Sequence, residues 1–411
     1  MCRKVITLFI ILFLCSSINA QDKYTGQSIE QIFVLPEEEI DIGLASLVIA
    51  KEAYPDMNIE FFDYALDYMV DNIRIMNQDN EDPEARIALL NYYLFVPGQW
   101  NDSLTFTFDF NDMLGRKTEN QYLNGLIATP KGNCLTIPLL YLAIADRLDW
   151  PIYAVRAPQH FFCRYIVDSE SNEYYNIETT AKGMISEDQY YIDEMRISEA
   201  GLKNGCYMRT LSEKEYLASL LHNHVQLFWT EKGVDLKNSF RCLDLAIQYD
   251  SLNCEAYWHL GNTHFIKARN YERLMNLEKN QLAYSPEALV TNNPATLINI
   301  PKTSSVIGFQ KQPGAIPSNP FGYVDDVVPR QNNQAPIRSS NIQKDNSKQI
   351  KLNMELAEIE NEYIPLIKEH LKKSEYYIEK AKNMGMVFET TQEFYQRQAD
   401  KQLEYDLKNN K

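Results

Sequence analysis

The sequence predicts an α+β protein in which a helix packs on a small antiparallel sheet, with further helices before and after this core. Three features support the prediction. Apolar residues recur at helical spacing over residues 37–95 and again from residue 212. Between these regions lie three short segments rich in Tyr, Phe, Val and Ile, separated by turn residues. Helices and antiparallel strands in separate parts of the chain are typical of the α+β class.

The first 20 residues have the layout of a secretory signal peptide. Two basic residues precede an apolar run over residues 5–14, and small residues follow up to Ala20. The run is too short to span a membrane permanently. We therefore expect a mature start at Gln21 and a periplasmic or secreted protein with no stable membrane span. Cys15 suggests a lipoprotein, but Leu14 is bulky where lipoprotein cleavage requires a small residue, so anchoring is the weaker alternative.

Charge and cysteine content narrow the function classes. The 411-residue chain has a formal net charge of −16, which argues against nucleic-acid binding because that affinity depends on Lys and Arg contacts to phosphates. An odd number of cysteines follows the signal peptide, so at least one thiol stays unpaired within the chain in an oxidising compartment. Their irregular spacing matches neither a disulfide scaffold nor a zinc site. They are Cys134, Cys163, Cys206, Cys242 and Cys254.

The region before the core is predicted to be helical over residues 37–95, with breaks at two prolines. Residues 104–110 alternate between apolar and polar side chains, which suits a half-buried strand or a loop packed by aromatic residues. A short helix through Tyr122 and Leu126 is expected to lead into the core.

Residues 131–178 contain the predicted core. Apolar positions after Asn133 recur at helical spacing up to Leu148, which places Cys134 in the first turn of a buried helix. The three strands that follow are expected to form an antiparallel sheet on that helix. Their ranges are 151–157, 160–167 and 174–179.

This core contains residues suited to nucleophilic catalysis. The first turn of a helix stabilises a thiolate at Cys134, and His160 opens the second strand as a candidate general base and then acid. Asn176 and Glu178 share one face of the third strand, and either could orient the imidazole. The backbone amide of Cys134 could stabilise an oxyanion. A buried cysteine and a strand histidine are also common as purely structural residues, so both interpretations stay open at this point.

The chain from residue 212 onward is predicted to be mainly helical. Residues 254–286 resemble a tetratricopeptide repeat of about 34 residues, and 220–253 a more degenerate copy. A Pro/Asn-rich stretch without periodicity follows and is expected to be a flexible insert. The last helical segment, broken at Pro365, would supply the helical pair that two repeats lack. The predicted divisions are 1–20 (signal peptide), 21–211 (α+β domain with helical N-terminal part), 212–285 (repeats), 286–350 (insert) and 351–411 (C-terminal helical segment).

The block KGNCLTIPLLYLAIADRLDWPIYAVRAPQHFFCRY, followed by YNIETT, resembles the core of the transglutaminase-like superfamily, in particular the SirB type whose core precedes tetratricopeptide repeats. The resemblance implies a papain/transglutaminase-like fold and a triad in which Cys134 is the nucleophile and His160 the base. Glu178 stands where the family usually has Asp, a departure that keeps Asn176 as an alternative. It also implies a cysteine peptidase or amidase acting through a thioester on a peptide or protein substrate with an amide bond.

A function of another class competes with catalysis: a noncatalytic scaffold that binds a protein partner through its repeats. A Cys134 locked in a disulfide, or a His160 pointing away from it, would favour that alternative. No cofactor and no metal site is predicted. His222 and His224 are two residues apart on a helix and point in different directions, so they are a poor metal pair.

Overall fold

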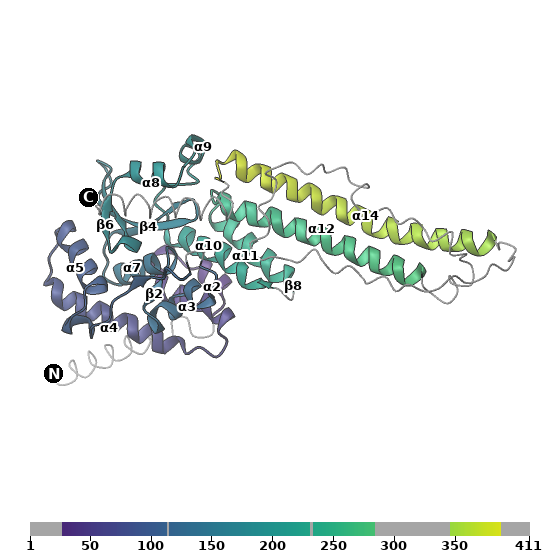
Figure 1. Cartoon of the computed structure of the whole chain (residues 1–411). Helices are drawn as coiled ribbons and strands as arrows, with labels where there is room; N and C mark the ends of the chain where they lie inside the picture. The colour runs from purple at the N-terminus through teal and green to yellow at the C-terminus, as the bar shows by residue number, and fades with distance from the viewer. Residues whose placement is uncertain (1–26, 113–114, 231–232, 284–345, 388–411) are drawn as a thin grey trace, which may run out of the picture. The chain divides into compact units, whose positions relative to one another are not determined.

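The structure is a computed structural model that describes residues 27–112, 115–230, 233–283 and 346–387 of the chain (Figure 1). The predicted signal peptide, and residues 286–345 of the predicted insert, lie outside the described residues. The chain divides into two units, of which the first holds Met1–Trp229, Lys237–His259 and Lys380–Val387. The second holds Thr230–Leu236, Leu260–Glu379 and the residues after 387. No helix among the described residues is long and apolar enough to cross a membrane.

The helices before the core form as predicted, and their starts are explained by capping. Asp41, Asn58 and Asp82 each accept a hydrogen bond from the backbone N–H three residues later, which satisfies one of the amides left unpaired at a helix start. The predicted helices are α3 (Ile42–Ala53), α4 (Ile59–Asn77) and α5 (Pro83–Phe95), and they are preceded by α2 (Ile29–Phe33), which was not predicted.

Residues 104–110 form less strand than their alternation predicted. Only β1 (Thr107–Phe108) is extended and paired, parallel to β2 (Lys131–Gly132). Phe106 is buried, whereas Phe110 is 76% exposed, so the rest of the segment corresponds to the alternative of a loop. The expected short helix is α6 (Leu123–Ala128).

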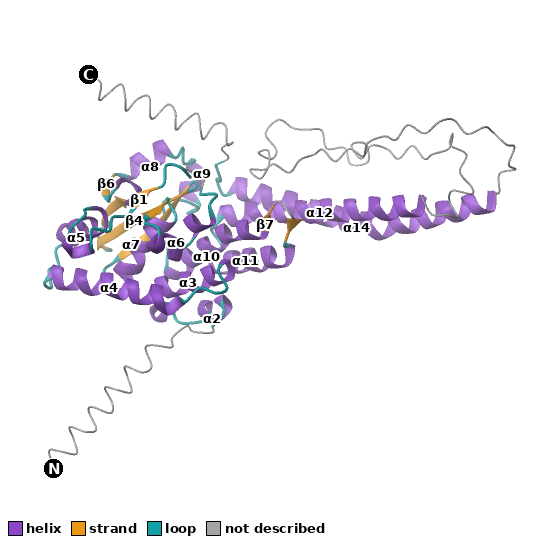
Figure 2. Ribbon diagram, turned by 60° about the horizontal axis from the view of Figure 1, so that its bottom comes forward, coloured by secondary structure: helices purple, strands orange, loops and turns teal. Residues whose placement is uncertain are grey.

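The predicted helix on a small antiparallel sheet is present. Helix α7 (Thr136–Arg147) packs against the first two strands of a four-stranded sheet and against α3, α4 and α6 (Figure 2). Its residues are buried all round from Thr136 to Ala145, as expected for a central core helix. The strands are β3 (Ile152–Ala157), β4 (His160–Asp168), β5 (Glu173–Glu178) and β6 (Met184–Ser186), in that order and all antiparallel. The three-residue β6 was not predicted from the sequence.

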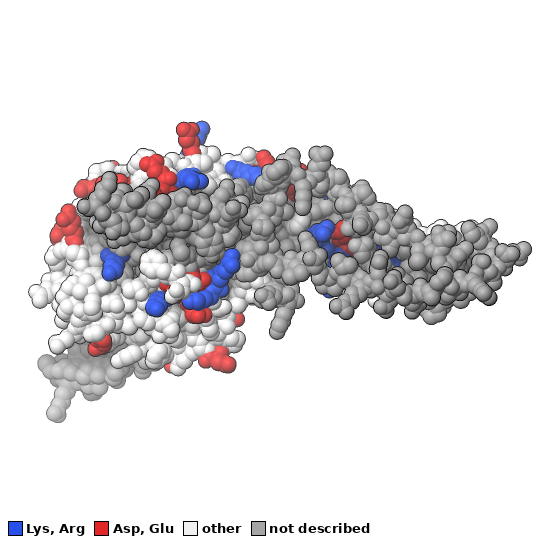
Figure 3. All heavy atoms as spheres, in the orientation of Figure 1, with Lys and Arg blue, Asp and Glu red and all other residues white. Residues whose placement is uncertain are grey.

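The first unit continues beyond the sheet. Its later elements are α8 (Asp188–Glu194), α9 (Glu199–Lys203), α10 (Glu213–His224), which packs on α3, and α11 (Leu236–Tyr249). In the chain, short strands β7 (Trp229–Thr230) and β8 (Gly233–Val234) lie between α10 and α11, and Thr230–Leu236 belong to the second unit. A disulfide joins Cys206 to Cys254, a pairing that the sequence left open, while Cys134 and Cys163 are not disulfide-bonded. On the face seen in Figure 3, basic and acidic side chains of the described residues are interspersed.

Helices α12 (Cys254–Ala283) and α14 (Asn346–Asn383) extend into the second unit, where they run antiparallel. Their shared core contains Ala268, Met275, Tyr363 and Ile367. A tetratricopeptide repeat requires two helices joined by a turn, but residues 254–283 form one continuous helix, so the structure differs from that expectation. The segment where the turn was expected contains neither Gly nor Pro.

The predicted break at Pro365 is wrong, because α14 continues through it. Proline removes one intrahelical hydrogen bond and destabilises a helix interior. Tyr363 and Ile367 on either side are buried against α12, and the Tyr363 hydroxyl donates to Glu278 at 2.6 Å. These contacts stabilise the helix on both sides of the proline.

Candidate functional site

Cys134 lies where α7 starts. The side-chain oxygen of Asn133 accepts hydrogen bonds from the backbone N–H groups of Leu135, at 2.9 Å, and Thr136, at 3.1 Å. The backbone carbonyl of Asn133 accepts the N–H of Ile137 at 3.1 Å. Asn133 therefore satisfies amides that would be left unpaired at the start of α7, and Cys134 lies in the turn two residues before Thr136, the first residue of the helix. The positive end of the helix dipole thus lies at the cysteine.

The Cys134 side chain is half-buried and faces the start of β4. Its sulfur lies 3.5 Å from the backbone carbonyl oxygen of Gln159. The Cys134 side chain is also among the groups that raise the pKa of the His160 imidazole. The tight turn between β3 and β4 brings the histidine to this position, because Ala157 pairs directly with His160.

His160 in turn contacts Glu178 at the end of β5. The distance from His160 Nε2 to Glu178 Oε2 is 2.8 Å, and the two side chains are only 11% and 4% exposed. Burial alone would lower the pKa of His160, but the Glu178 carboxylate and the Cys134 side chain raise this pKa to about 10. The histidine is therefore an imidazolium at neutral pH. Since Nε2 faces Glu178, Nδ1 is the nitrogen left for Cys134.

Glu178 is held as a charged carboxylate. Burial would raise its pKa, but the imidazolium of His160 and hydrogen bonds from Thr180 keep this pKa below its ordinary value. Oε1 accepts hydrogen bonds from the Thr180 backbone N–H, at 3.0 Å, and from the Thr180 hydroxyl. Because Oε1 is fixed in this way, Oε2 is directed at His160. The structure thus brings Cys134, His160 and Glu178 into one connected row.

Asn176 lies in a different network. Its side-chain oxygen accepts a hydrogen bond from Arg164 Nε at 2.7 Å, and its amide nitrogen donates to Asp188 at 2.7 Å. The pairing register explains this placement, because Arg164 on β4 lies directly opposite Asn176 on β5. The structure therefore places Glu178, and not Asn176, against the imidazole.

Cys163 is buried. Its sulfur lies on the opposite side of β4 from His160, 3.9 Å from the backbone carbonyl of Pro138 in α7. Burial raises the pKa of this thiol well above its ordinary value. Cys163 is thus an internal reference for a thiol without a reactive environment.

A buried contact between Glu255 and His222, behind the β3–β4 turn, was missed by the sequence analysis. Glu255 Oε1 accepts the backbone N–H of Gln159 at 3.1 Å, and Glu255 Oε2 lies 3.3 Å from His222 Nε2. Gln159 has a left-handed backbone conformation, with φ of 55°, so this contact helps to hold a strained turn. The separation of 96 residues between Gln159 and Glu255 explains why no sequence pattern indicated the contact.

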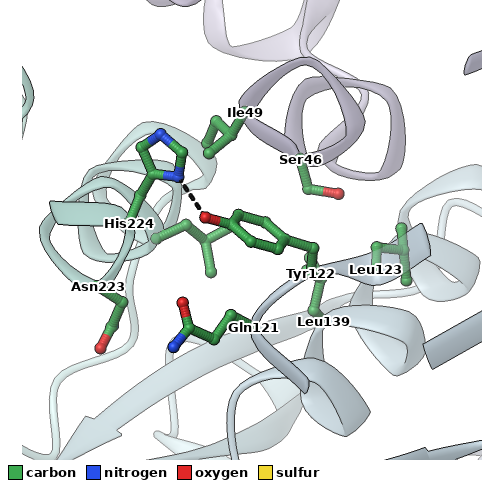
Figure 4. A pocket seen from close by; sticks show the side chains of 9 residues that line it. Ser46, Ile49, Gln121, Tyr122, Leu123, Leu139, Asn223 and His224 are labelled. Carbon is green, nitrogen blue, oxygen red and sulfur yellow. Dashed lines mark hydrogen bonds between the residues drawn. The ribbon is translucent and has the colours of Figure 1, made fainter. Parts of the chain in front are cut away.

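Among the described residues, the first unit contains at least two cavities, and neither of these two is lined by Cys134 or His160. One of about 10 Å³ is lined in part by Tyr122 and His224 (Figure 4). The other, of about 260 Å³, is lined in part by Asp146, Trp150 and Glu213.

Comparisons with known proteins agree with part of the expected family. A family model described as transglutaminase-like superfamily matches residues 62–218, a range that contains Cys134, His160 and Glu178. UPF0162 proteins from two strains of Xylella fastidiosa, Temecula1 / ATCC 700964 and 9a5c, are each 25% identical over 132 residues. The alignment covers 32% of this chain and 44% of each relative, so the chain spans less than half the length of the curated relatives it matches. No solved structure gives a significant match. Residues 62–218 thus have the sequence features of a transglutaminase-like superfamily domain, whereas neither the SirB type nor the tetratricopeptide extension is shown.

Proposed function

We propose that this protein is an exported transglutaminase-like cysteine hydrolase, a peptidase or amidase, in which Cys134 is the nucleophile. The observation that carries the proposal is the connected row of Cys134, His160 and Glu178, with Cys134 at a helix start and His160 Nε2 2.8 Å from a buried carboxylate. A thiolate nucleophile requires a cation beside the sulfur and a third group that orients this cation, and the imidazolium of His160 and the carboxylate of Glu178 are suited to these roles.

The first half of the reaction uses the thiolate and the imidazolium as a pair. The Cys134 sulfur attacks the amide carbonyl carbon, and the carbon–sulfur bond forms as the carbonyl oxygen becomes an oxyanion. Backbone N–H groups at the start of α7 are suited to stabilise that charge. His160 donates its Nδ1 proton to the departing amine, the carbon–nitrogen bond breaks, and a thioester remains.

The second half of the reaction restores the pair. Neutral His160 takes a proton from water through Nδ1, and the resulting hydroxide oxygen attacks the thioester carbonyl. The carbon–sulfur bond then breaks to release a carboxylic acid and the Cys134 thiolate, beside an imidazolium once more. An amine in place of water would give transamidation by the same steps. Glu178 stays ionised throughout and holds Nε2–H.

Export is part of the proposal. It is supported by the signal-like first 20 residues and by the Cys206–Cys254 disulfide, because disulfides persist mainly in oxidising compartments. We propose a periplasmic or secreted protein on these grounds.

The test uses the chain from residue 21 onward and compares it with Cys134→Ala. A screen on peptide, isopeptide and cell-wall amide substrates should give activity that the substitution abolishes. Independently of substrate, Cys134 should react with a thiol alkylator at about pH 6 faster than an unstructured thiol, which is mostly protonated there. Mass spectrometry of the peptides assigns the label, and Cys163 should stay unlabelled in the folded protein. Slow labelling of Cys134, or activity that survives Cys134→Ala, would refute the proposal.

A second candidate function is a noncatalytic scaffold, and the second unit contains the observation that favours it. Large apolar side chains on α12 and α14 are exposed there, including Leu274 and Leu277 (both 46%) and Met354 (60%). Exposed apolar groups of this kind are suited to a protein partner. If this is the sole function, Cys134→Ala leaves partner binding intact while no amide substrate is turned over by the parent chain.

A further inference from the structure

A carboxylate, an imidazole and a thiol, all groups that bind metals, lie together in the first unit. None of the three belongs to the row of Cys134, His160 and Glu178. Glu52 lies near the end of α3, His224 is the last residue of α10, and Cys242 lies within α11. One ligand atom from each lies within 4.8 Å of the other two. We propose that Glu52, His224 and Cys242 form a zinc site. The spacing of His222 and His224 gave no sign of it, because the partners of His224 come from distant parts of the chain.

The distances suit zinc. His224 Nε2 is 3.1 Å from Glu52 Oε2, and two ligands of one tetrahedral zinc ion, each bonded at about 2.0–2.2 Å, have donor atoms roughly 3.3–3.6 Å apart. Only a small adjustment would therefore be needed to seat the ion between them. The donor set of thiolate, imidazole and carboxylate is also one that zinc accepts and that calcium or magnesium does not favour.

Burial gives the site both a closed and an open side. Cys242 is fully buried and His224 is 2% exposed, so two donors are excluded from bulk water. The Glu52 side chain is 32% exposed, which leaves an entry path and a place for a water molecule as fourth ligand. Three protein ligands and one open position are typical of zinc sites that bind a small molecule.

Tyr122 supplies the outer support that metal-binding histidines usually have. Its hydroxyl lies 2.7 Å from His224 Nδ1, and the two side chains point toward one another in Figure 4. When Nε2 binds zinc, Nδ1 carries the ring proton and donates it to the Tyr122 oxygen, which fixes the ring. The proton of the Cys242 thiol is released to solvent as the zinc–sulfur bond forms, together with any proton on Nε2.

Arg241 opposes the metal. Its guanidinium donates to both carboxylate oxygens of Glu52, at 2.7 Å and 2.6 Å, and to Glu30 at 2.8 Å. It therefore offsets the negative charge that zinc would neutralise and competes for the same oxygens. This competition gives the proposal a test that a folding defect cannot imitate, since removing Arg241 should tighten binding.

The experiment titrates the chain from residue 21 onward with Co²⁺ and follows the thiolate-to-cobalt charge-transfer absorption. It is done in a Cys134→Ala background, because Cys134, His160 and Glu178 are themselves a thiol, imidazole and carboxylate set. We expect one cobalt per chain, displaced by Zn²⁺. Adding Cys242→Ser should abolish the charge-transfer band, whereas Cys163→Ser, which removes a buried thiol elsewhere, should leave it unchanged.

The Arg241→Gln variant completes the test. In the Cys134→Ala background it should bind Co²⁺ roughly tenfold more tightly, since a charge-assisted hydrogen bond to Glu52 no longer competes. A gain cannot arise from misfolding, and circular dichroism checks that the Cys242→Ser variant is folded. Absence of the charge-transfer band in large cobalt excess, a band that survives Cys242→Ser in the folded variant, or unchanged binding by Arg241→Gln would each overturn the proposal.

Discussion

The Glu178→Gln variant tests whether the negative charge of Glu178 is needed beside His160 and Cys134. Glutamine has the same length as glutamate and can still accept the hydrogen bonds from Thr180, so the backbone at the end of β5 should be retained. What is lost is the negative charge 2.8 Å from His160 Nε2. We expect the pKa of His160 to fall from about 10, because burial, which lowers it, is then no longer offset by a carboxylate.

The size of the effect follows from how little water reaches the pair. With the His160 and Glu178 side chains 11% and 4% exposed, solvent screening is weak. A hydrogen bond between charged groups contributes about 1.5–3 kcal/mol, and about 1.4 kcal/mol corresponds to a factor of ten. The population of the reactive thiolate–imidazolium pair at about pH 6 should therefore fall roughly ten- to a hundredfold.

The assay is the rate of Cys134 alkylation as a function of pH. If Cys134 forms the proposed thiolate–imidazolium pair with His160, the rate in the parent protein should change little between about pH 6 and pH 9. In Glu178→Gln it should be slow at the lower pH and rise toward the higher one. A matched control is Glu173→Gln, an exposed carboxylate on the same strand, which should leave the profile unchanged.

One result would refute the reasoning. If Glu178→Gln is folded and alkylates at the parent rate at about pH 6, the carboxylate does not sustain the imidazolium. Glu178 would then be a residue that stabilises the β5 turn through Thr180 and has no part in the chemistry.

Three further predictions concern the surroundings of the site. Asn176→Ala should lower the unfolding free energy by about 1–3 kcal/mol, because it removes hydrogen bonds from a buried network. It should leave the Cys134 alkylation rate of the folded protein unchanged. A slower rate would show that Asn176 orients the imidazole. Cys254→Ser should cost up to about 4 kcal/mol in urea unfolding, because the disulfide closes a loop with a sequence separation of 48 residues, and reduction of the parent should cost the same. Glu213 has its pKa raised from 4.5 to about 7 by burial and neighbouring carboxylates, so the folded state binds its proton more tightly and the carboxyl costs stability as pH rises through that window. Glu213→Gln should therefore have a higher unfolding free energy than the parent above about pH 7, by less than about 1 kcal/mol because the group is half-exposed. At about pH 4 the two proteins should be equally stable. The exposed control Glu81→Gln should match the parent at either pH.

Local signals in the sequence predicted the core of the fold. The helical spacing after Asn133 and the three aromatic and β-branched segments that follow correspond to α7 and to β3, β4 and β5. Longer-range features were not predicted. The spacing of apolar residues in 254–283 matches a two-helix repeat and therefore indicated two helices. The residues at the expected turn nevertheless allow a continuous helix, and packing against α14 stabilises that continuous helix. The predicted helix break at Pro365 was wrong because buried contacts with α12 stabilise α14 on both sides of the proline.

The candidate site could be predicted to the level of residue types and strand faces. Alternation put Asn176 and Glu178 on one face, but only the pairing register decides which of them meets His160, and register depends on turn geometry and on the partner strand. Contacts between distant segments, such as Glu255 with Gln159, or His224 with Glu52 and Cys242, have no sequence signature at all. They arise from the packing of helices whose order in the chain carries no information about which side chains meet.

Thr180 explains how Glu178 can stand where the transglutaminase-like superfamily usually has Asp. A glutamate side chain has one more rotatable bond than aspartate, and a free carboxylate at that distance would orient an imidazole poorly. Here Oε1 is fixed by the backbone and the hydroxyl of Thr180, only two residues further along the chain, and the carboxylate is buried. The extra freedom is thereby removed, and Oε2 is left with one direction, toward His160 Nε2. The turn after β5 thus supplies the rigidity that a shorter side chain would provide by itself.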